Sequence, residues 1–317
     1  MTSKLPSFKD LPIDPKYPAK SAWGLWGDDD SLGTMNLLTP ERAVEASKLV
    51  KSGKLFPMNW TMENKHTLFN RGGFEHVVKE LFPNCAFDDV YNNWNTQSSS
   101  QWDGLGHVCN RHTPGFFYNN VSAEKIRNGN DQLGIHHLAR KGIAGRAVLL
   151  DFRRWANKNG IEYDPLTRYE IDIKDLDKCA KDQGVTFKEG DILLVRSGFI
   201  EAYDKTSEET KIKLAEDIST CGVKACDESL EYIWNHHFAA VGGDTAAFEA
   251  WPPTDNLNTA MHAIFLGGWG MPIGELFNLE QLADEADKTG IYEFFFTSAP
   301  LNKKGGIASP PNAICIM

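Results

Sequence analysis

The sequence lacks the features that mark secreted, membrane-spanning and nucleic-acid-binding proteins. Its six cysteines lie at positions 85, 109, 179, 221, 226 and 315 without a CxxC spacing, which predicts reduced thiols. The polar first 20 residues hold no apolar signal segment, and no run reaches the roughly 20 apolar residues that cross a bilayer. Lys plus Arg total 33 against 43 Asp plus Glu, and the formal charge of −10 disfavours binding to nucleic acid or an anionic membrane. We therefore expect a cytoplasmic protein that binds a small molecule.

The commonest catalytic motifs are also missing. The sequence has no GxSxG nucleophile elbow, no Walker loop, no GxGxxG after a strand and no HExxH. These absences exclude the most frequent hydrolase, nucleotide-binding and metalloprotease patterns. It also has no repeat of fixed period and no linker between two halves. We predict an irregular N-terminal arm over residues 1–20 and a single domain over residues 21–317.

The hydrophobic pattern favours a mixed fold. Short apolar runs of strand length, flanked by Gly, Asp or polar residues, alternate with amphipathic stretches of helix length. A helix is also predicted to begin at Thr39-Pro40-Glu41, where a hydroxyl can cap the helix and proline suits its first position. The class is therefore α/β or α+β. The predicted strands are 147–152, 192–195, 238–241 and 294–296, and the predicted helices are 207–219, 227–235 and 279–288.

Polar side chains are concentrated between Gln97 and His112, in the sequence QSSSQWDGLGHVCNRH. Burying such a segment is costly unless its polar groups bind one another or a ligand. Asp103 and His107 are four residues apart, and either a helix or a loop would let the carboxylate and the imidazole converge. Spacing alone leaves two interpretations open, a catalytic pair or a hydrogen-bonded structural pair.

A second polar cluster runs from His262 to Glu275, where an apolar run and a glycine-rich turn separate the two residues. Imidazole and carboxylate are suitable donors for zinc or manganese, and a hydrolytic site keeps one position open for water. The alternative is a half-buried histidine and a glutamate that interacts with a helix dipole. Three aromatic residues flank the first cluster and are candidates for substrate binding: Trp102, Phe116 and Tyr118.

The two clusters together resemble the cyclase family that includes bacterial kynurenine formamidase and isatin hydrolase, whose motif is HxGTHxDxPxH. Residues 97–107 read QSSSQWDGLGH, so Asp103 and His107 match, while Gln97 and Gln101 replace the two earlier histidines and Leu105 replaces the proline. Further blocks resemble a fungal and bacterial branch of this family, among them WGLWGDDDSLGTMNLLTPERA, GDILLVRSGF and GMPIGELFNLEQLA. The resemblance implies a swivelling β/β/α-type fold with a mixed β core and subunits that form homodimers or homotetramers.

The resemblance also implies a set of site residues. Asp103, His262 and Glu275 would hold one divalent ion, zinc or manganese, assisted by Gln101, and His107 would act as the acid and base. Because glutamine binds zinc far less well than histidine, a two-metal centre is disfavoured and a metal-free protein stays an alternative.

Three hypotheses of function follow. The first is metal-assisted hydrolysis of a C–N amide or a lactone in a small aromatic or polyketide-like molecule. The second is a metal-independent lyase or isomerase, including a ring-forming cyclase, in which Asp103 and His107 act directly. The third is a small-molecule binding protein without turnover. Stoichiometric metal, or its absence, separates the first two hypotheses, and substrate consumption separates both from the third.

Overall fold

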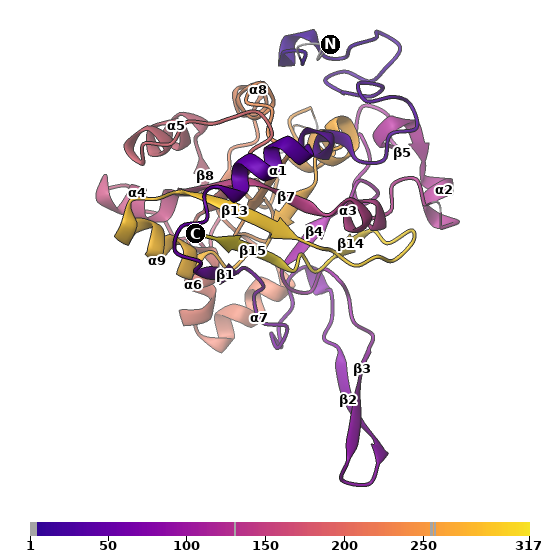
Figure 1. Cartoon of the computed structure of the whole chain (residues 1–317), viewed down its shortest axis with the longest axis vertical. Helices are drawn as coiled ribbons and strands as arrows, with labels where there is room; N and C mark the ends of the chain where they lie inside the picture. Colours follow the sequence, from indigo (N-terminus) through magenta and orange to yellow (C-terminus); the bar gives the residue numbers. More distant parts are fainter. Residues whose placement is uncertain (1–4, 130, 254–255, 257) are drawn as a thin grey trace.

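A nine-stranded mixed sheet forms the centre of the computed structural model, which describes residues 5–129, 131–253, 256 and 258–317 (Figure 1). Its central strands, β7, β9, β11 and β12, run parallel, and the flanking strands pair antiparallel. In order across the sheet, the strands are β1 (Leu55–Pro57), β15 (Ala313–Ile316), β13 (Glu293–Ser298), β7 (Ile143–Asp151), β9 (Ile192–Arg196), β11 (Ala240–Gly243), β12 (Ile273–Glu275), β4 (Gln101–Asp103) and β14 (Ala308–Ser309).

Hydrophobic cores cover both faces of this sheet. Along β7, Val148 and Leu150 belong to one cluster of buried side chains, whereas Ala147 and Leu149 belong to another. Successive side chains of a strand point to opposite faces, so an uninterrupted apolar run is what a strand buried on both sides requires. The apolar run at 147–150, which underlies the predicted strand at 147–152, therefore reflects burial on both sides.

Helices surround the sheet, and several begin where the sequence predicts. Thr39 caps α1, where its Oγ1 accepts a hydrogen bond from the backbone of Arg42 at 3.3 Å, and Pro40 is the first residue of the helix. The α-helices are α1 (Pro40–Ser47), α2 (Ala123–Arg127), α3 (His136–Lys141), α4 (Phe152–Lys158), α5 (Ile173–Asp182), α6 (Phe199–Lys205), α7 (Glu208–Glu216), α8 (Asp227–Asn235) and α9 (Glu280–Thr289). None of the helices in the described part of the chain is long and apolar enough to span a membrane.

Shorter elements complete the fold. A π-helical segment, η5 (Ala263–Trp269), follows His262 directly. The 3-10 turns are η1 (Phe8–Asp10), η2 (Gly33–Leu37), η3 (Leu68–Asn70) and η4 (Tyr118–Asn120), and two small sheets pair β5 (Phe116–Phe117) with β6 (Val121–Ser122) and β8 (Glu170–Ile171) with β10 (Gly222–Val223).

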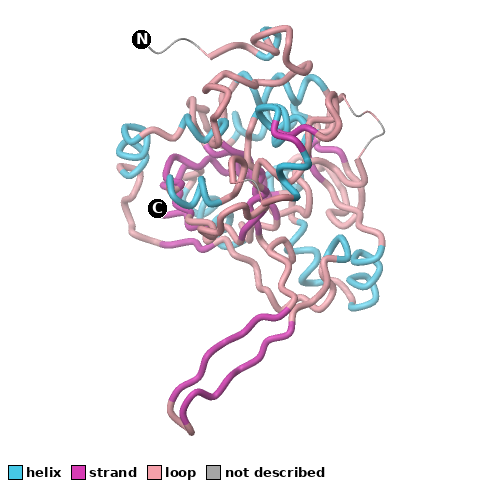
Figure 2. The backbone as a smooth tube through the Cα atoms, turned by 90° about the vertical axis from the view of Figure 1, so that its right-hand side faces the viewer, coloured by secondary structure: helices cyan, strands magenta, loops and turns pink. Residues whose placement is uncertain are grey.

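A long hairpin projects from the body of the molecule (Figures 1 and 2). Its strands, β2 (Glu75–Phe82) and β3 (Ala86–Asn92), form a two-stranded sheet of their own. Large apolar side chains on it are exposed, including Phe82 and Phe87 at 65% and 58%. This hairpin was not among the elements predicted from the sequence.

The observed elements confirm the predicted α/β class. The four predicted strands correspond to β7, β9, β11 and β13, and the three predicted helices to α7, α8 and α9. Leu279 is the N-cap of α9, and Asn278 Oδ1 accepts a hydrogen bond from the backbone of Glu280 at 3.3 Å. In the described part of the predicted N-terminal arm, Phe8 packs edge-on against Trp269.

Candidate metal centre

Two neighbouring strands bring the carboxylates of the candidate site together. β4 pairs antiparallel with β12, and Gln101 lies directly opposite Glu275 in this register. Asp103 is two residues beyond Gln101 on β4, so both side chains point to the same face of the sheet. The two polar clusters of the sequence therefore meet.

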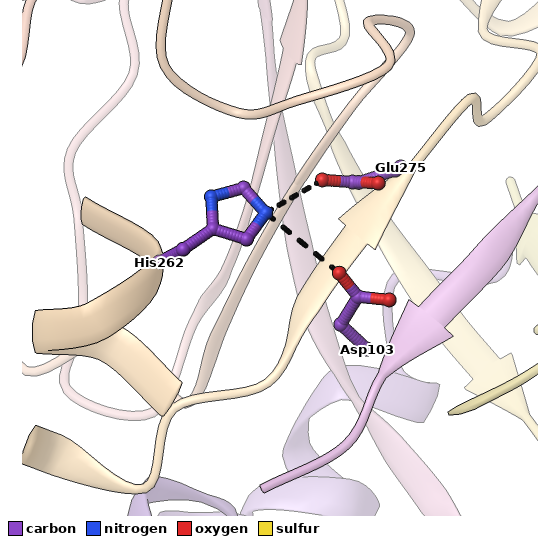
Figure 3. A group of neighbouring side chains, drawn as sticks. All are labelled: Asp103, His262 and Glu275. Atoms are coloured by element: carbon purple, nitrogen blue, oxygen red, sulfur yellow. Dashed lines mark hydrogen bonds and ion pairs between the residues drawn. The ribbon is translucent and has the colours of Figure 1, made fainter. Parts of the chain in front are cut away.

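His262 joins the two carboxylates from the residue before η5. Its Nε2 lies 2.9 Å from Glu275 Oε1 and 3.7 Å from Asp103 Oδ2 (Figure 3). One ligand atom from each of the three residues lies within 4.8 Å of the other two. Asp103 is fully buried and Glu275 is 2% exposed, yet Asp103 Oδ2 has no hydrogen-bond partner. A buried carboxylate oxygen without a donor indicates that a cation or a proton belongs beside it.

The buried residue Glu249 orients the imidazole of His262. Glu249 Oε2 lies 2.7 Å from Nδ1, and Oε1 accepts from the backbone N–H of His262 at 3.2 Å. This contact places a proton on Nδ1 and turns Nε2 toward Glu275 and Asp103, the arrangement of a metal-binding histidine held by a carboxylate. Glu249 was not among the site residues predicted from the sequence.

The same contacts determine the charges in the centre. Burial alone would lower the pKa of His262, but attraction to Glu249 and hydrogen bonds to Glu249 and Glu275 raise it well above its ordinary value. Burial, reinforced by the charge of Asp103, raises the pKa of Glu275. Near neutral pH these contacts favour the protonated form of His262, whose positive charge would partly neutralise the surrounding carboxylates.

His107 lies beside the three residues in the turn that follows β4. Its Nε2 is 3.5 Å from Asp103 Oδ2 and 3.4 Å from Gln97 Nε2. Burial lowers the pKa of His107, while the charge of Asp103 partly opposes this effect. The neutral imidazole is therefore favoured near neutral pH, and a quarter of the side chain stays exposed.

Two glutamines and an arginine surround the carboxylates. Gln97 Nε2 donates to Asp103 Oδ1 at 2.8 Å, and Gln101 Nε2 donates to Glu275 Oε2. Arg71 Nη1 donates to Gln101 Oε1 at 3.1 Å. As oriented here, Gln101 presents its amide hydrogens to a carboxylate and its oxygen to Arg71. A ligand role for Gln101 would require the amide to turn, and stays a prediction.

A cavity of about 250 Å³ opens onto this centre. Its apolar wall includes Phe69 and Trp251, whose rings meet edge-to-face with centroids 5.3 Å apart. Such a wall suits a planar apolar group. The polar part of the wall contains His107, Glu249, His262, Glu275, Arg71 and Arg111.

Comparison with known proteins places this fold in a family. A family model described as "Putative cyclase" matches residues 38–250. The chain belongs to this cyclase family. No curated protein sequence matches the chain.

Solved structures agree with the cyclase-family assignment. A crystal structure described as that of a novel cyclase is 28% identical, with a TM-score of 0.83 over 94% of this chain and 99% of the other. Isatin hydrolase A from Labrenzia aggregata, bound to benzyl benzoate, is 14% identical, with a TM-score of 0.59 over 85% of this chain and 94% of the other. Isatin hydrolase A from Ralstonia solanacearum is 15% identical, with a TM-score of 0.55 over 88% and 98% of the two chains. At such low identity, the two hydrolases support the fold alone.

The three aromatic residues predicted to bind substrate are not in the wall of the cavity of this cyclase-family chain. Trp102 points to the opposite face of β4 from Asp103 and packs against Phe277 in the core. Phe116 is 39% exposed, and Tyr118 is buried with its hydroxyl donating to Asp30 Oδ2 at 3.1 Å. Their substrate-binding role stays a prediction without geometric support.

The donor set of this cyclase-family chain fits a divalent ion. One imidazole nitrogen and two carboxylate oxygens suit zinc or manganese, and the unpartnered Asp103 Oδ2 supplies a buried negative atom at the point where they converge. Asp103, His262 and Glu275 would hold the ion, and Glu249 would hold His262.

Proposed function

We propose that this chain is a metal-assisted hydrolase of a C–N amide or a lactone in a small aromatic or polyketide-like molecule. The observation that carries this proposal is the convergence of Asp103, His262 and Glu275. They lie beside a cavity that is lined by His107 and by the aromatic rings of Phe69 and Trp251. When bound, a divalent ion supplies a Lewis acid that polarises a carbonyl and acidifies a water molecule.

His107 is the group suited to move protons in this reaction. It lines the cavity, and its position in the turn after β4 keeps its imidazole next to Asp103. In the hydrolysis, the water oxygen bonds to the carbonyl carbon and the C–N or C–O bond breaks. His107 accepts a proton from the water and donates it to the leaving nitrogen or oxygen, so no other reactant is needed.

The aromatic wall supports an aromatic or other planar substrate. Phe69 and Trp251 offer ring edges and faces, and Arg71 lies over the ring of Phe69 at 4.9 Å, which fixes one side of this wall.

We propose in addition that the protein acts in the cytoplasm and assembles as a homodimer or homotetramer. Sedimentation velocity tests the assembly.

Metal removal tests the proposed function. The purified protein would be analysed for zinc and manganese, depleted with a chelator, and assayed on a panel of aryl amides and lactones with and without each ion. We expect the rate of hydrolysis to fall at least tenfold on depletion and to return when one of the two ions is added. In a separate assay, we expect His107→Asn to lower kcat by about 10²- to 10⁴-fold. Undiminished turnover by ion-free protein would overturn the proposal and favour a metal-independent lyase or isomerase.

A further inference from the structure

Each carboxylate of the candidate centre has one oxygen bound by a glutamine and the other directed into the centre. Gln97 binds Asp103 Oδ1 and Gln101 binds Glu275 Oε2. The other oxygens, Asp103 Oδ2 and Glu275 Oε1, are the ones nearest to His262 Nε2. The two amides therefore fix the rotation of the two carboxylates and leave one oxygen of each directed at the point of convergence.

Arg71 in turn fixes the direction of Gln101 and the backbone at Gln97. A guanidinium group can only donate hydrogen bonds, so its contact with Gln101 Oε1 turns the NH₂ group of that amide toward Glu275. The same Nη1 donates to the backbone oxygen of Gln97 at 2.8 Å, which anchors the segment that carries this residue. Arg71 is partly buried, and its two contacts come from residues on either side of the Ser98–Ser100 run.

We propose that Arg71 is a positioning residue of the metal centre, which acts through Gln101 and Gln97 to hold the carboxylates of Glu275 and Asp103 in the orientation that binds a divalent ion. This inference rests on the proposed function, because it assigns the purpose of the orientation to ion binding. It gives the two glutamines a role as carboxylate partners. Outer contacts of this kind change metal affinity or activity by about 10- to 100-fold when they are removed.

The charge of Arg71 and its positioning role predict opposite changes in ion affinity when Arg71 is replaced by a neutral residue. A positive charge close to a cation site repels the ion, so charge alone predicts that Arg71→Met binds the ion more tightly. Loss of positioning predicts weaker binding, because the amide of Gln101 and the carboxylate of Glu275 are released. The sign of the change therefore distinguishes the two effects.

Arg111 provides a matched control. It lines the same cavity and is exposed, and no hydrogen bond or ion pair from its side chain occurs within the described ranges. Arg111→Met thus removes an equal charge from the cavity wall without releasing a glutamine. Arg71→Lys keeps the charge but lacks the planar guanidinium group, so it separates charge from geometry.

Calorimetric titration of ion-free protein with Mn²⁺ and with Zn²⁺ tests the proposal. We expect Arg71→Met to raise the dissociation constant about 10- to 100-fold, Arg71→Lys to raise it less, and Arg111→Met to leave it unchanged or lower it. If Arg71→Met does not fold, Gln101→Met interrupts the same relay with Arg71 intact, and we expect the same weakening. Unchanged or tighter binding by folded Arg71→Met or Gln101→Met would overturn the proposal.

A crystal structure of ion-free Arg71→Met provides a readout that needs neither ion nor substrate. We expect the side chains of Gln101 and Glu275 to rotate away from their wild-type positions, and wild-type positions for both side chains would also overturn the proposal. Failure of the proposed function looks different, since it would appear as ion-independent turnover, or no turnover, in the wild-type protein.

Discussion

At the scale of single residues, the buried carboxylate of Glu249 determines which nitrogen of His262 faces the centre. Glu249→Gln keeps the shape but removes the charge that holds a proton on Nδ1. We expect the variant to bind Mn²⁺ or Zn²⁺ about 10- to 100-fold more weakly, as measured by calorimetric titration. If the folded variant binds the ion with wild-type affinity, Glu249 has no role in the metal centre. Thermal unfolding of the ion-free variant is the control for misfolding.

The sequence made the residues of the centre predictable only in part. Its polar clusters and the family resemblance singled out Asp103, His107, His262 and Glu275, and the fold brings all four together. Arg71 was not predictable, because it lies 30 residues from Gln101 along the chain and reaches it only through the fold. An acidic residue soon after a strand end was the one available signal for Glu249.

At the scale of elements, close packing around β10 holds the backbone of Glu249 in place. A Cβ atom at Gly222 would lie 2.4 Å from the carbonyl carbon of Glu249. The obstacle is backbone, so Gly222→Ala must displace the segment that carries Glu249. We expect a loss of about 1–3 kcal/mol in the free energy of unfolding, measured by denaturant titration, together with weaker ion binding.

Gly73→Ala is the matched control for this substitution. A Cβ atom at Gly73 would have no heavy atom within 4 Å other than those of its chain neighbours, so the added methyl group meets open space. We expect little change in unfolding free energy or ion affinity. Equal effects of the two substitutions would show that packing against Glu249 is unimportant.

Prediction of elements succeeded where burial alone decides the pattern. β7 and β9 are largely apolar because both faces of the sheet are covered, so their runs are visible in the sequence. β4 was not predicted, because its three residues, Gln101–Asp103, include an amide and a carboxylate. Burial of these groups depends on contacts with residues far away along the chain, such as Glu275. The local sequence pattern contains no signal of such contacts.

At the scale of the whole molecule, the projecting hairpin is the feature least predictable from the sequence. Phe82 and Phe87 would ordinarily indicate a core, yet both are exposed on strands that pair only with each other. A hairpin that packs against nothing is at best marginally stable in water. The position of the hairpin therefore depends on how its two ends join the body of the molecule. Arg71 precedes the hairpin and Gln97 follows it, and both residues contact the candidate centre.

Truncation of this hairpin tests whether it matters for the stability of the fold. Replacement of residues 79–88 by Asn-Gly leaves the Val78–Asp89 pair next to a two-residue turn and removes the exposed phenylalanines. Because the deleted part contributes no core residue, we expect a change in unfolding free energy of about 0.5 kcal/mol or less and wild-type ion affinity, measured by thermal unfolding and calorimetry. A loss of several kcal/mol, accompanied by a lower mass in sedimentation velocity, would contradict this expectation. Such a result would show that a second copy of the chain covers the hairpin, since stability would then depend on a contact absent from the single chain.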